Sequence, residues 1–372
     1  MKKLKKLKRP KAPKLTKNAY HGVRRLTTRR TVTPEEKVSD ALSNVPRITN
    51  ETVGEHREEV LSSARKYIYP LQHSKHRVVR TSIGLLVLVI VAFFLFCGLD
   101  LYKFQGTSGF IYDVTTVVPF PVAKAGPHWI SYESYLFELR RNMHYYQTQQ
   151  QSNFSTKSGK AQLARLKSQA MAQTVQDAYV KDLAAQYHVG VSNQAVDNQV
   201  ALVRSQNRLG SSARTFREVL DEFWGWNEAD FKRELKQQLL TQAVVAKLDT
   251  ATAQRAQATL KQLQGGADFA TLAGQVSEDP TTKGNGGQYA SALTLNDPQV
   301  PPAVTAVLFN LKPGQISGVI NAGYTLNIAK LLDRSGSTLH GAHMQFNFQP
   351  VTTYTKPFQA KQPPHYYIKL KS

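Results

Sequence analysis

The sequence predicts an α+β protein that is held in a membrane by a single helix. The first observation is a run of twenty-two almost wholly apolar residues, 81–102. The second is helical spacing of apolar residues across 131–248, which predicts an all-α module. The third is a stretch from 252 to 348 in which helical patterns alternate with strand patterns and glycine-rich turns. This stretch predicts an α/β domain.

The apolar run is TSIGLLVLVIVAFFLFCGLDLY, from Thr81 to Tyr102, and it carries no charge between Arg80 and Asp100. At a helical rise of about 1.5 Å per residue it is roughly 33 Å long, enough to cross a hydrocarbon core of about 30 Å. A buried helix of a soluble protein is the alternative. Such a helix would need protein on every side, because valine, leucine, isoleucine and phenylalanine occupy all of its faces. The run therefore predicts a transmembrane helix.

Charge predicts the orientation of this helix. Residues 1–80 contain 21 Lys and Arg against seven Asp and Glu, and Arg77 and Arg80 directly precede the span. By the positive-inside rule the N-terminus is cytoplasmic and residues 103–372 are extracytoplasmic. A cleaved signal peptide is not favoured, because its basic region would be eighty residues long and no small-residue cleavage site follows. A lipoprotein anchor at Cys97 is not favoured either, because Phe96 is too bulky for such a site.

Cysteine and histidine usage limits the chemistry outside the membrane. Cys97 is the only cysteine, so disulfides, zinc–thiolate clusters and thiol catalysis are not expected there. His340 and His343 are three residues apart, as are His73 and His76, and neither pair has a cysteine or clustered carboxylate beside it. On a strand this spacing places the two rings on opposite faces. We expect no metal and no cofactor.

Residues 1–80 form a basic cytoplasmic segment. The first 33 residues hold 13 Lys and Arg and no acid, a composition that cannot bury a core and predicts disorder. The segment is suited to contact with anionic lipid on the inner leaflet, and RNA or ribosome contact is a second reading. A solvated tail that only sets the topology is equally compatible, and nothing aromatic is interleaved to stack on bases. Residues 34–70 predict a short helix that ends near Pro70.

Beyond the span, residues 103–117 are expected to be a spacer, and 118–250 a helical module. Phe120–Ala125 predicts a strand, and helices are expected at 131–147, 160–187, 192–208, 212–224 and 227–248, with Ser192 and Asn227 as caps.

The module resembles the N-terminal chaperone module of SurA/PrsA-type foldases. The resemblance is carried by FPVAKAGPHWISYESYLFELRRN (120–142), VGVSNQAVDNQV (189–200) and FREVLDEFWGWNEADFKRELKQQLLTQAV (216–244), in that order. It implies a protein that binds unfolded or newly exported polypeptides.

Residues 251–349 resemble the parvulin-type peptidyl-prolyl isomerase domain, and the resemblance implies an α/β domain with a four-stranded antiparallel sheet. The matching pieces are a helix ending in GGADFA, the turn SEDP, the pair Gly286–Gly287, an apolar helix ending in FNL, the turn LKPGQIS, and a final strand that opens with Gly-Tyr. Proline–glycine and glycine–glycine pairs suit tight turns, because glycine adopts backbone angles that other residues disfavour.

The resemblance implies catalysis of rotation about X–Pro bonds, whose barrier of about 18–20 kcal/mol comes from amide resonance. It implies a pocket of two histidines, a cysteine or aspartate, and a methionine and a phenylalanine that grip the proline ring. Asp279 falls at the Cys/Asp position and Phe309 at an aromatic position. Val300 and Val304 stand where the family has Met and Phe.

The final strand departs from the family at Gly323-Tyr324-Thr325, where the family has Gly-Tyr-His, so Tyr324 is assigned to substrate binding and Thr325 to catalysis. The family's first strand and its histidine are missing before Thr252. The segment 338–348 contains Ala-His-Met at 342–344, and we expect it to pair with the last strand through a short hairpin, in effect a circular permutation. That would return His343 to the pocket.

Simpler readings stay open for both polar residues. His343 could be an ordinary strand histidine or part of a truncated second copy, and Asp279 could be a turn residue that bonds its own backbone in Ser277–Pro280. Residues 350–372 are rich in Pro and Lys and end in YYIKLK, which fits either an edge strand of the same sheet or a loose tail.

The expected function is that of a membrane-anchored extracytoplasmic foldase or chaperone of the parvulin class, with isomerase activity reduced or lost. One alternative is an inactive scaffold that keeps the parvulin fold as an interaction surface. Another is an active isomerase that uses Tyr324, Thr325 and His343 differently. No P-loop, H-E-x-x-H or G-x-S-x-G motif is present.

Overall fold

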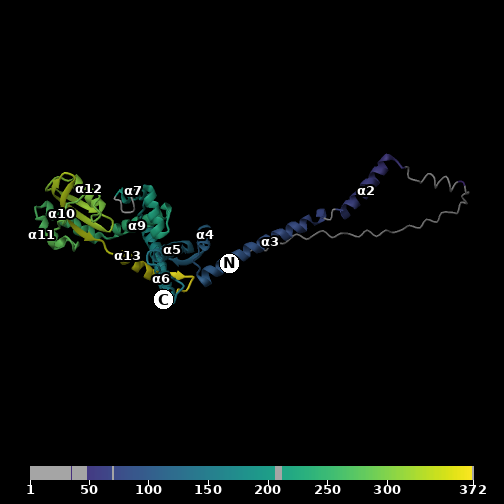
Figure 1. The fold of residues 1–372 in the computed structure, drawn as a ribbon, viewed down its shortest axis with the longest axis horizontal. Helices are drawn as coiled ribbons and strands as arrows, with labels where there is room; N and C mark the ends of the chain where they lie inside the picture. The colour runs from purple at the N-terminus through teal and green to yellow at the C-terminus, as the bar shows by residue number, and fades with distance from the viewer. Residues whose placement is uncertain (1–34, 36–47, 69–70, 206–211, 371–372) are drawn as a thin grey trace, which may run out of the picture. The chain divides into compact units, whose positions relative to one another are not determined.

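The structure is a computed structural model that describes residues 35, 48–68, 71–205 and 212–370 (Figure 1). The chain divides into two units, residues 1–88 and 89–372. The predictions made for the basic residues 1–33 lie outside the described residues. In the first unit α2 spans Asn50–Ile68, which confirms a helix within 34–70.

The predicted membrane span is helical throughout. Helix α3 runs from Leu71 to Leu99, and a π-helical turn, Asp100–Phe104, continues it. Within the described residues, one helical stretch, Arg77–Phe104, is long and apolar enough to cross a membrane, and its side chains are largely exposed. The stretch contains the whole of 81–102 and begins four residues earlier.

The segment expected to be a spacer forms a further helix. Helix α4 spans Gly109–Val117, and the Ser108 hydroxyl caps it by accepting a hydrogen bond from the Ile111 N–H. Ile111 and Thr115 are buried. An apolar helix of this kind joins the core of the helical module, because leaving Ile111 in water would forfeit its burial energy.

The helices of the module agree closely with those predicted from the sequence. Asn227 caps α9 in a capping box with Asp230, as its position predicted. Gly225 adopts a left-handed conformation (φ 66°) that ends α8. The helices are α5 Tyr132–Thr148, α6 Lys157–Gln186, α7 Asn193–Ser205, α8 Ala213–Trp224 and α9 Glu228–Leu248.

The module is not all-α, because it also contains a small antiparallel sheet. Strand β1 (Pro121–Ala125) pairs with β2 (His128–Ser131) on one side and with β6 (His365–Tyr366) on the other. The C-terminal segment thus returns to the module. Helix α13 (Thr352–Lys361) packs against α6, as the yellow segment beside the blue-green helices in Figure 1 shows.

Neither reading offered for residues 350–372 describes what the structure shows. The Tyr367 N–H donates to the Val122 carbonyl (3.0 Å), and Ile368 is buried in the same apolar cluster as Val122 and Tyr179. This segment therefore completes the core of the helical module and adds no strand to the parvulin-like sheet.

The parvulin-like domain is built on one antiparallel sheet in the order β3-β4-β5. The sequence predicts four strands, and that prediction is wrong: the fourth segment, around Gln288–Leu293, contacts β5 only through isolated bridges to Ala342 and Leu339. The elements are α10 Thr250–Gln264, α11 Phe269–Val276, a 3-10 turn Lys283–Asn285, α12 Pro302–Asn310, β3 Ile316–Asn321, β4 Thr325–Ser335 and β5 Thr338–Asn347.

Both faces of this sheet are covered. Ile328 and Met344 pack with apolar residues of α10 and α11 in one cluster, whereas Ala329 and Leu331 pack with those of α12 in another. Successive side chains of a strand point to opposite faces, so neighbouring residues of β4 feed different clusters. Each strand of the sheet is thereby held by packing on two sides.

The expected hairpin is present and places His343 in the sheet. Strands β4 and β5 pair antiparallel through a turn in which Ser335 lies opposite Thr338 and Gly336 takes a positive φ of 58°. His343 is paired with Ala329 in the middle of the ladder. The hairpin confirms the proposed position of the strand.

Candidate functional site

The candidate site is a network of polar side chains centred on His343, which is 3% exposed. Nε2 of His343 lies 2.9 Å from Oδ2 of Asp279 and 3.1 Å from Oγ1 of Thr282. Nδ1 lies 3.0 Å from Oδ1 of Asn327 on the neighbouring strand. Both ring nitrogens are therefore engaged, so the histidine is held in one orientation.

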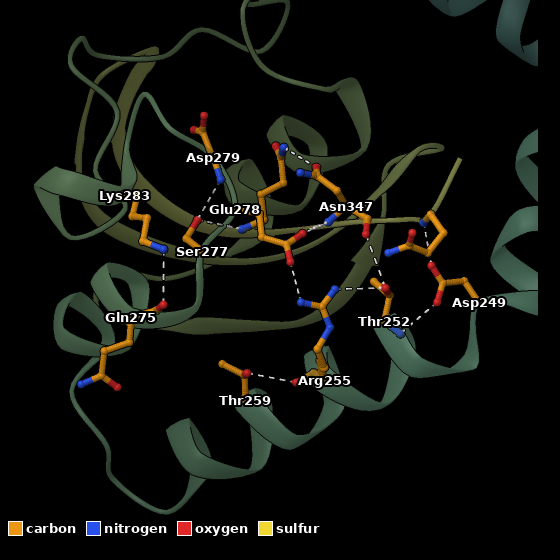
Figure 2. A network of polar contacts seen from close by, with 12 residues as sticks. Asp249, Thr252, Arg255, Thr259, Gln275, Ser277, Glu278, Asp279, Lys283 and Asn347 are labelled. Carbon is orange, nitrogen blue, oxygen red and sulfur yellow. Dashed lines mark hydrogen bonds and ion pairs between the residues drawn. The ribbon is translucent and has the colours of Figure 1, made fainter. Parts of the chain in front are cut away.

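Hydrogen bonds to the main chain of β5 attach the turn that carries Asp279 to this strand (Figure 2). The Ser277 hydroxyl accepts hydrogen bonds from the N–H groups of Gln345 (3.2 Å) and Asp279 (3.4 Å). The Glu278 N–H donates to the Gln345 carbonyl at 2.8 Å. These contacts bring the turn after α11 against the strand that carries His343.

The side chain of Glu278 fixes the same turn to α10. One carboxylate oxygen accepts from the Asn347 N–H (2.6 Å), and the other from Arg255 (2.5 Å). Figure 2 shows Arg255 reaching from α10 to both Glu278 and Thr252. Helix, turn and strand are thus joined beside Asp279, and its position depends on all three.

Asp279 is a turn aspartate, as one reading of the sequence expected, and its carboxylate also reaches His343. Its carboxylate accepts hydrogen bonds from the Thr281 N–H (3.0 Å) and hydroxyl, as a turn aspartate does, and it also contacts His343. Burial opposes its ionisation, but the hydrogen bonds from Thr282, Thr281 and His343 lower the pKa of Asp279 to about 2. The group is a carboxylate at neutral pH.

Burial lowers the pKa of His343 below its ordinary value, although Asp279 acts in the opposite direction. A neutral ring that donates from Nε2 to Asp279 must accept at Nδ1. The side-chain amide of Asn327 is then rotated by 180°, which exchanges its nitrogen and oxygen without changing the shape of the group. In this orientation the nitrogen donates to Nδ1 of His343 and the oxygen accepts from the hydroxyl of Thr325. Asp279 and Asn327 together select the tautomer.

The aromatic ring of Tyr289 stacks on the imidazole. The ring centroids are 4.6 Å apart and the planes differ by 21°. Sequence reasoning missed Tyr289, Thr282 and Asn327. The strand register could have indicated Asn327, because it lies two residues from Ala329, the partner of His343.

The other predicted residues lie apart from this contact network. Thr325 reaches it only through Asn327, whose amide lies 3.0 Å from the threonine hydroxyl. Val300 and Val304 are buried in an apolar cluster, and Phe309 is packed against it with Arg334 over its ring. Tyr324 is 47% exposed just before β4. Of the predicted catalytic residues, Asp279 and His343 are the two in direct contact.

A cavity of about 530 Å³ lies in the helical module, among β2, α5, α6 and α9. Ile130, Phe137 and Leu240 give it an apolar lining, and the exposed Trp129 stands at its border. Charged residues of both signs surround this surface. They are His128, Glu138, Asp177, Lys181, Arg233, Glu234 and Lys236.

Comparison with known families agrees with this architecture. Residues 72–245 match the family described as SurA-like N-terminal domain, and residues 239–333 match the PPIC-type PPIASE domain. A SurA-like domain followed by a PPIC-type domain supports a foldase of the SurA/PrsA parvulin type. The PPIC-type match ends at residue 333, so β5 and its histidine lie beyond it. The end of the match at residue 333 agrees with β5 being the last strand of the domain in sequence, after the elements that the match covers.

A curated relative supports the same assignment over a shorter stretch. The chain is 37% identical over 86 residues to a protein named Chaperone SurA from Methylobacillus flagellatus. The match covers 23% of this chain and 18% of that relative, so the two share a region that is less than a fifth of the relative's length. The SurA-like and PPIC-type domains support a foldase or chaperone of the parvulin class.

Proposed function

We propose that this SurA/PrsA-type protein is a membrane-anchored extracytoplasmic chaperone that binds unfolded, newly exported polypeptides in the cavity of its helical module. The observation that carries the proposal is the cavity of about 530 Å³ beside a strand edge, whose lining is partly apolar. The anchor is the helix around 81–102, and the basic residues before it orient the chain with the domains outside. The basic segment would contact anionic lipid.

The cavity has two properties that suit an extended polypeptide. Trp129, which is 62% exposed, offers apolar surface to a client side chain beside the nearly buried Ile130 and Phe137. Strand β2 is an edge of its sheet among the described strands, since β1 is its partner there, and residues 128–131 line the cavity. An unfolded segment can add to such an edge through main-chain hydrogen bonds, which do not depend on its sequence.

Isomerase activity is the second part of the proposal, and we infer that it is weak. Rotation of an X–Pro bond needs an apolar seat for the proline and hydrogen bonds to the twisted amide, with no nucleophile or metal. His343 and Asp279 would supply the polar side of this site. The burial of His343 at 3% exposure favours weak activity, and it equally favours the scaffold alternative.

Photo-crosslinking tests client binding in the full-length chain in detergent micelles or liposomes. A crosslinking residue in place of Trp129 should capture an unfolded client, whereas the same residue in place of Tyr187, an exposed tyrosine at the end of α6, should capture little. Equal capture at both positions would contradict binding in the cavity. Aggregation suppression by the Trp129→Ala variant should fall at least threefold relative to Tyr187→Ala.

Protease added to intact spheroplasts tests the topology. The proposal expects cleavage of residues 103–372 and protection of residues 1–80. Protection of the large domains would place the protein where exported clients never reach it, and the proposed function would be abandoned.

A further inference from the structure

Main-chain hydrogen bonds to β5 hold Tyr289 over His343. The Tyr289 N–H donates to the Gly341 carbonyl (3.0 Å), and the His343 N–H donates to the Gly287 carbonyl (2.8 Å). Gly287 has a φ of 82°, and a Cβ there would lie 2.3 Å from the His343 carbonyl oxygen. Only glycine allows this close approach, so the glycine pair sets the distance between the Tyr289 segment and β5.

The ring of Tyr289 contacts both the imidazole and an apolar cluster. It stacks on His343 and packs against the buried cluster that includes Val300, Val304 and Leu308. The two valines occupy the positions that the sequence analysis assigned to gripping a proline ring. The tyrosine ring therefore links the polar residues and the apolar cluster of the proposed isomerase site.

The hydroxyl of Tyr289 is badly matched to these surroundings. Its oxygen is buried and has no hydrogen-bond partner among the described residues. Leaving a buried hydroxyl unpaired is unfavourable, because the group loses its hydrogen bonds to water and gains none in return. The space that the side chain occupies is thus suited to an apolar ring, and a proline ring is one.

We propose that Tyr289 occupies the prolyl position of this domain, and that a substrate proline can enter only when the tyrosine side chain moves out. This proposal rests on the proposed isomerase site and adds the residue that limits its activity. Two rings cannot share one space, so the substrate must displace the stacking and apolar contacts of Tyr289. The displacement needs a side-chain rotation alone, since the hydrogen bonds that hold the segment are made by the main chain.

The test uses the full-length chain in detergent and a peptide with one X–Pro bond, with isomerisation followed by NMR exchange. Tyr289→Ala should raise kcat/KM at least tenfold over the parent, because the site is open without the ring. Tyr289→Phe should leave kcat/KM within twofold, because the ring is kept, and should raise the Tm. Leu295→Ala, which truncates an exposed residue of the same loop, is the matched control and should change neither quantity.

Several results would overturn the proposal. One is a Tyr289→Ala variant that unfolds cooperatively and binds the unfolded client like the parent but shows no gain in isomerisation. Another is a gain that survives in the Tyr289→Ala, His343→Ala double variant, since it would not arise at this site. If Tyr289→Ala loses cooperative unfolding, Tyr289→Val decides in its place, because valine keeps the strand preference and part of the apolar contact.

Client binding is measured on the same samples, which separates this proposal from the chaperone function. A parent protein that does not suppress aggregation contradicts the proposed chaperone function and does not affect the proposal for Tyr289. A parent protein that isomerises the peptide as fast as the Tyr289→Ala variant contradicts the proposal for Tyr289 and does not affect the proposed chaperone function.

Discussion

Nε2 of His343 lies 2.9 Å from Oδ2 of Asp279, although the two residues are 64 positions apart in the sequence. The histidine comes from the last strand of the parvulin-like sheet and the aspartate from the turn after α11. A contact across this sequence distance requires the hairpin and the helix packing to be formed. The pair therefore reports on the folding of the whole domain as well as on its proposed site.

Asp279→Ala should lower the free energy of unfolding of the parvulin-like domain by about 1–3 kcal/mol, because it leaves His343 and Thr282 without an acceptor in a buried place. Urea unfolding followed by circular dichroism measures the change. The exposed Asp333 gives a matched control, and Asp333→Ala should cost less than about 0.5 kcal/mol. Equal losses for both variants would contradict the structural role of Asp279.

Acid should weaken the same domain through Asp279. The folded pKa of about 2 lies below the ordinary value of about 3.9, so the folded state binds fewer protons than the unfolded state between these values. Its contribution to stability is complete above about pH 4 and is lost as the pH falls through 2. The Asp279→Asn variant should show a shallower decline of Tm between pH 4 and pH 2, and an unchanged decline would exclude this carboxylate as the cause.

Asn327→Asp should raise the pKa of His343, because a carboxylate in place of the amide favours the imidazolium. NMR titration of the His343 ring protons measures this directly. In the parent, burial keeps the pKa below the ordinary value of 6.5. A His343 pKa that does not rise in the variant would show that Asn327 is not the partner of Nδ1 in solution.

A buried carboxylate weakens the helical module at alkaline pH. Burial raises the pKa of Glu138 to about 7, Glu234 and Asp177 add to the shift, and Arg141 partly offsets it. Because the folded pKa is raised, the stability linked to this group is complete below its unfolded pKa of about 4.5 and is lost as the pH rises through 7.

Glu138→Gln should therefore stabilise the module at pH 8, by about 1–2 kcal/mol, and change it little at pH 5. Urea unfolding at the two pH values measures the difference. Glu218→Gln, at an exposed position of α8, should give no pH-dependent gain. A gain for Glu138→Gln that is the same at pH 5 and pH 8 would contradict a charge effect.

Local features could be predicted from the sequence because they depend on neighbouring residues. The Asn227 cap is one such feature, since the capping side chain bonds N–H groups two and three residues away. The glycine that ends α8 is another. The pairing of β5 with β4 was also predictable, because a short hairpin joins them.

The sequence by itself determined the apolar helix around 81–102, the helices of the module and the order of the two domains, and it singled out His343 and Asp279, whose side chains are in contact. Each of these follows from composition, periodicity or a short motif. Only the tertiary structure decided that the C-terminal strand joins β1, that Asn327 and Tyr289 complete the surroundings of His343, and that the sheet has three strands. These features depend on strand register and on packing between distant residues, and no local pattern in the chain specifies either.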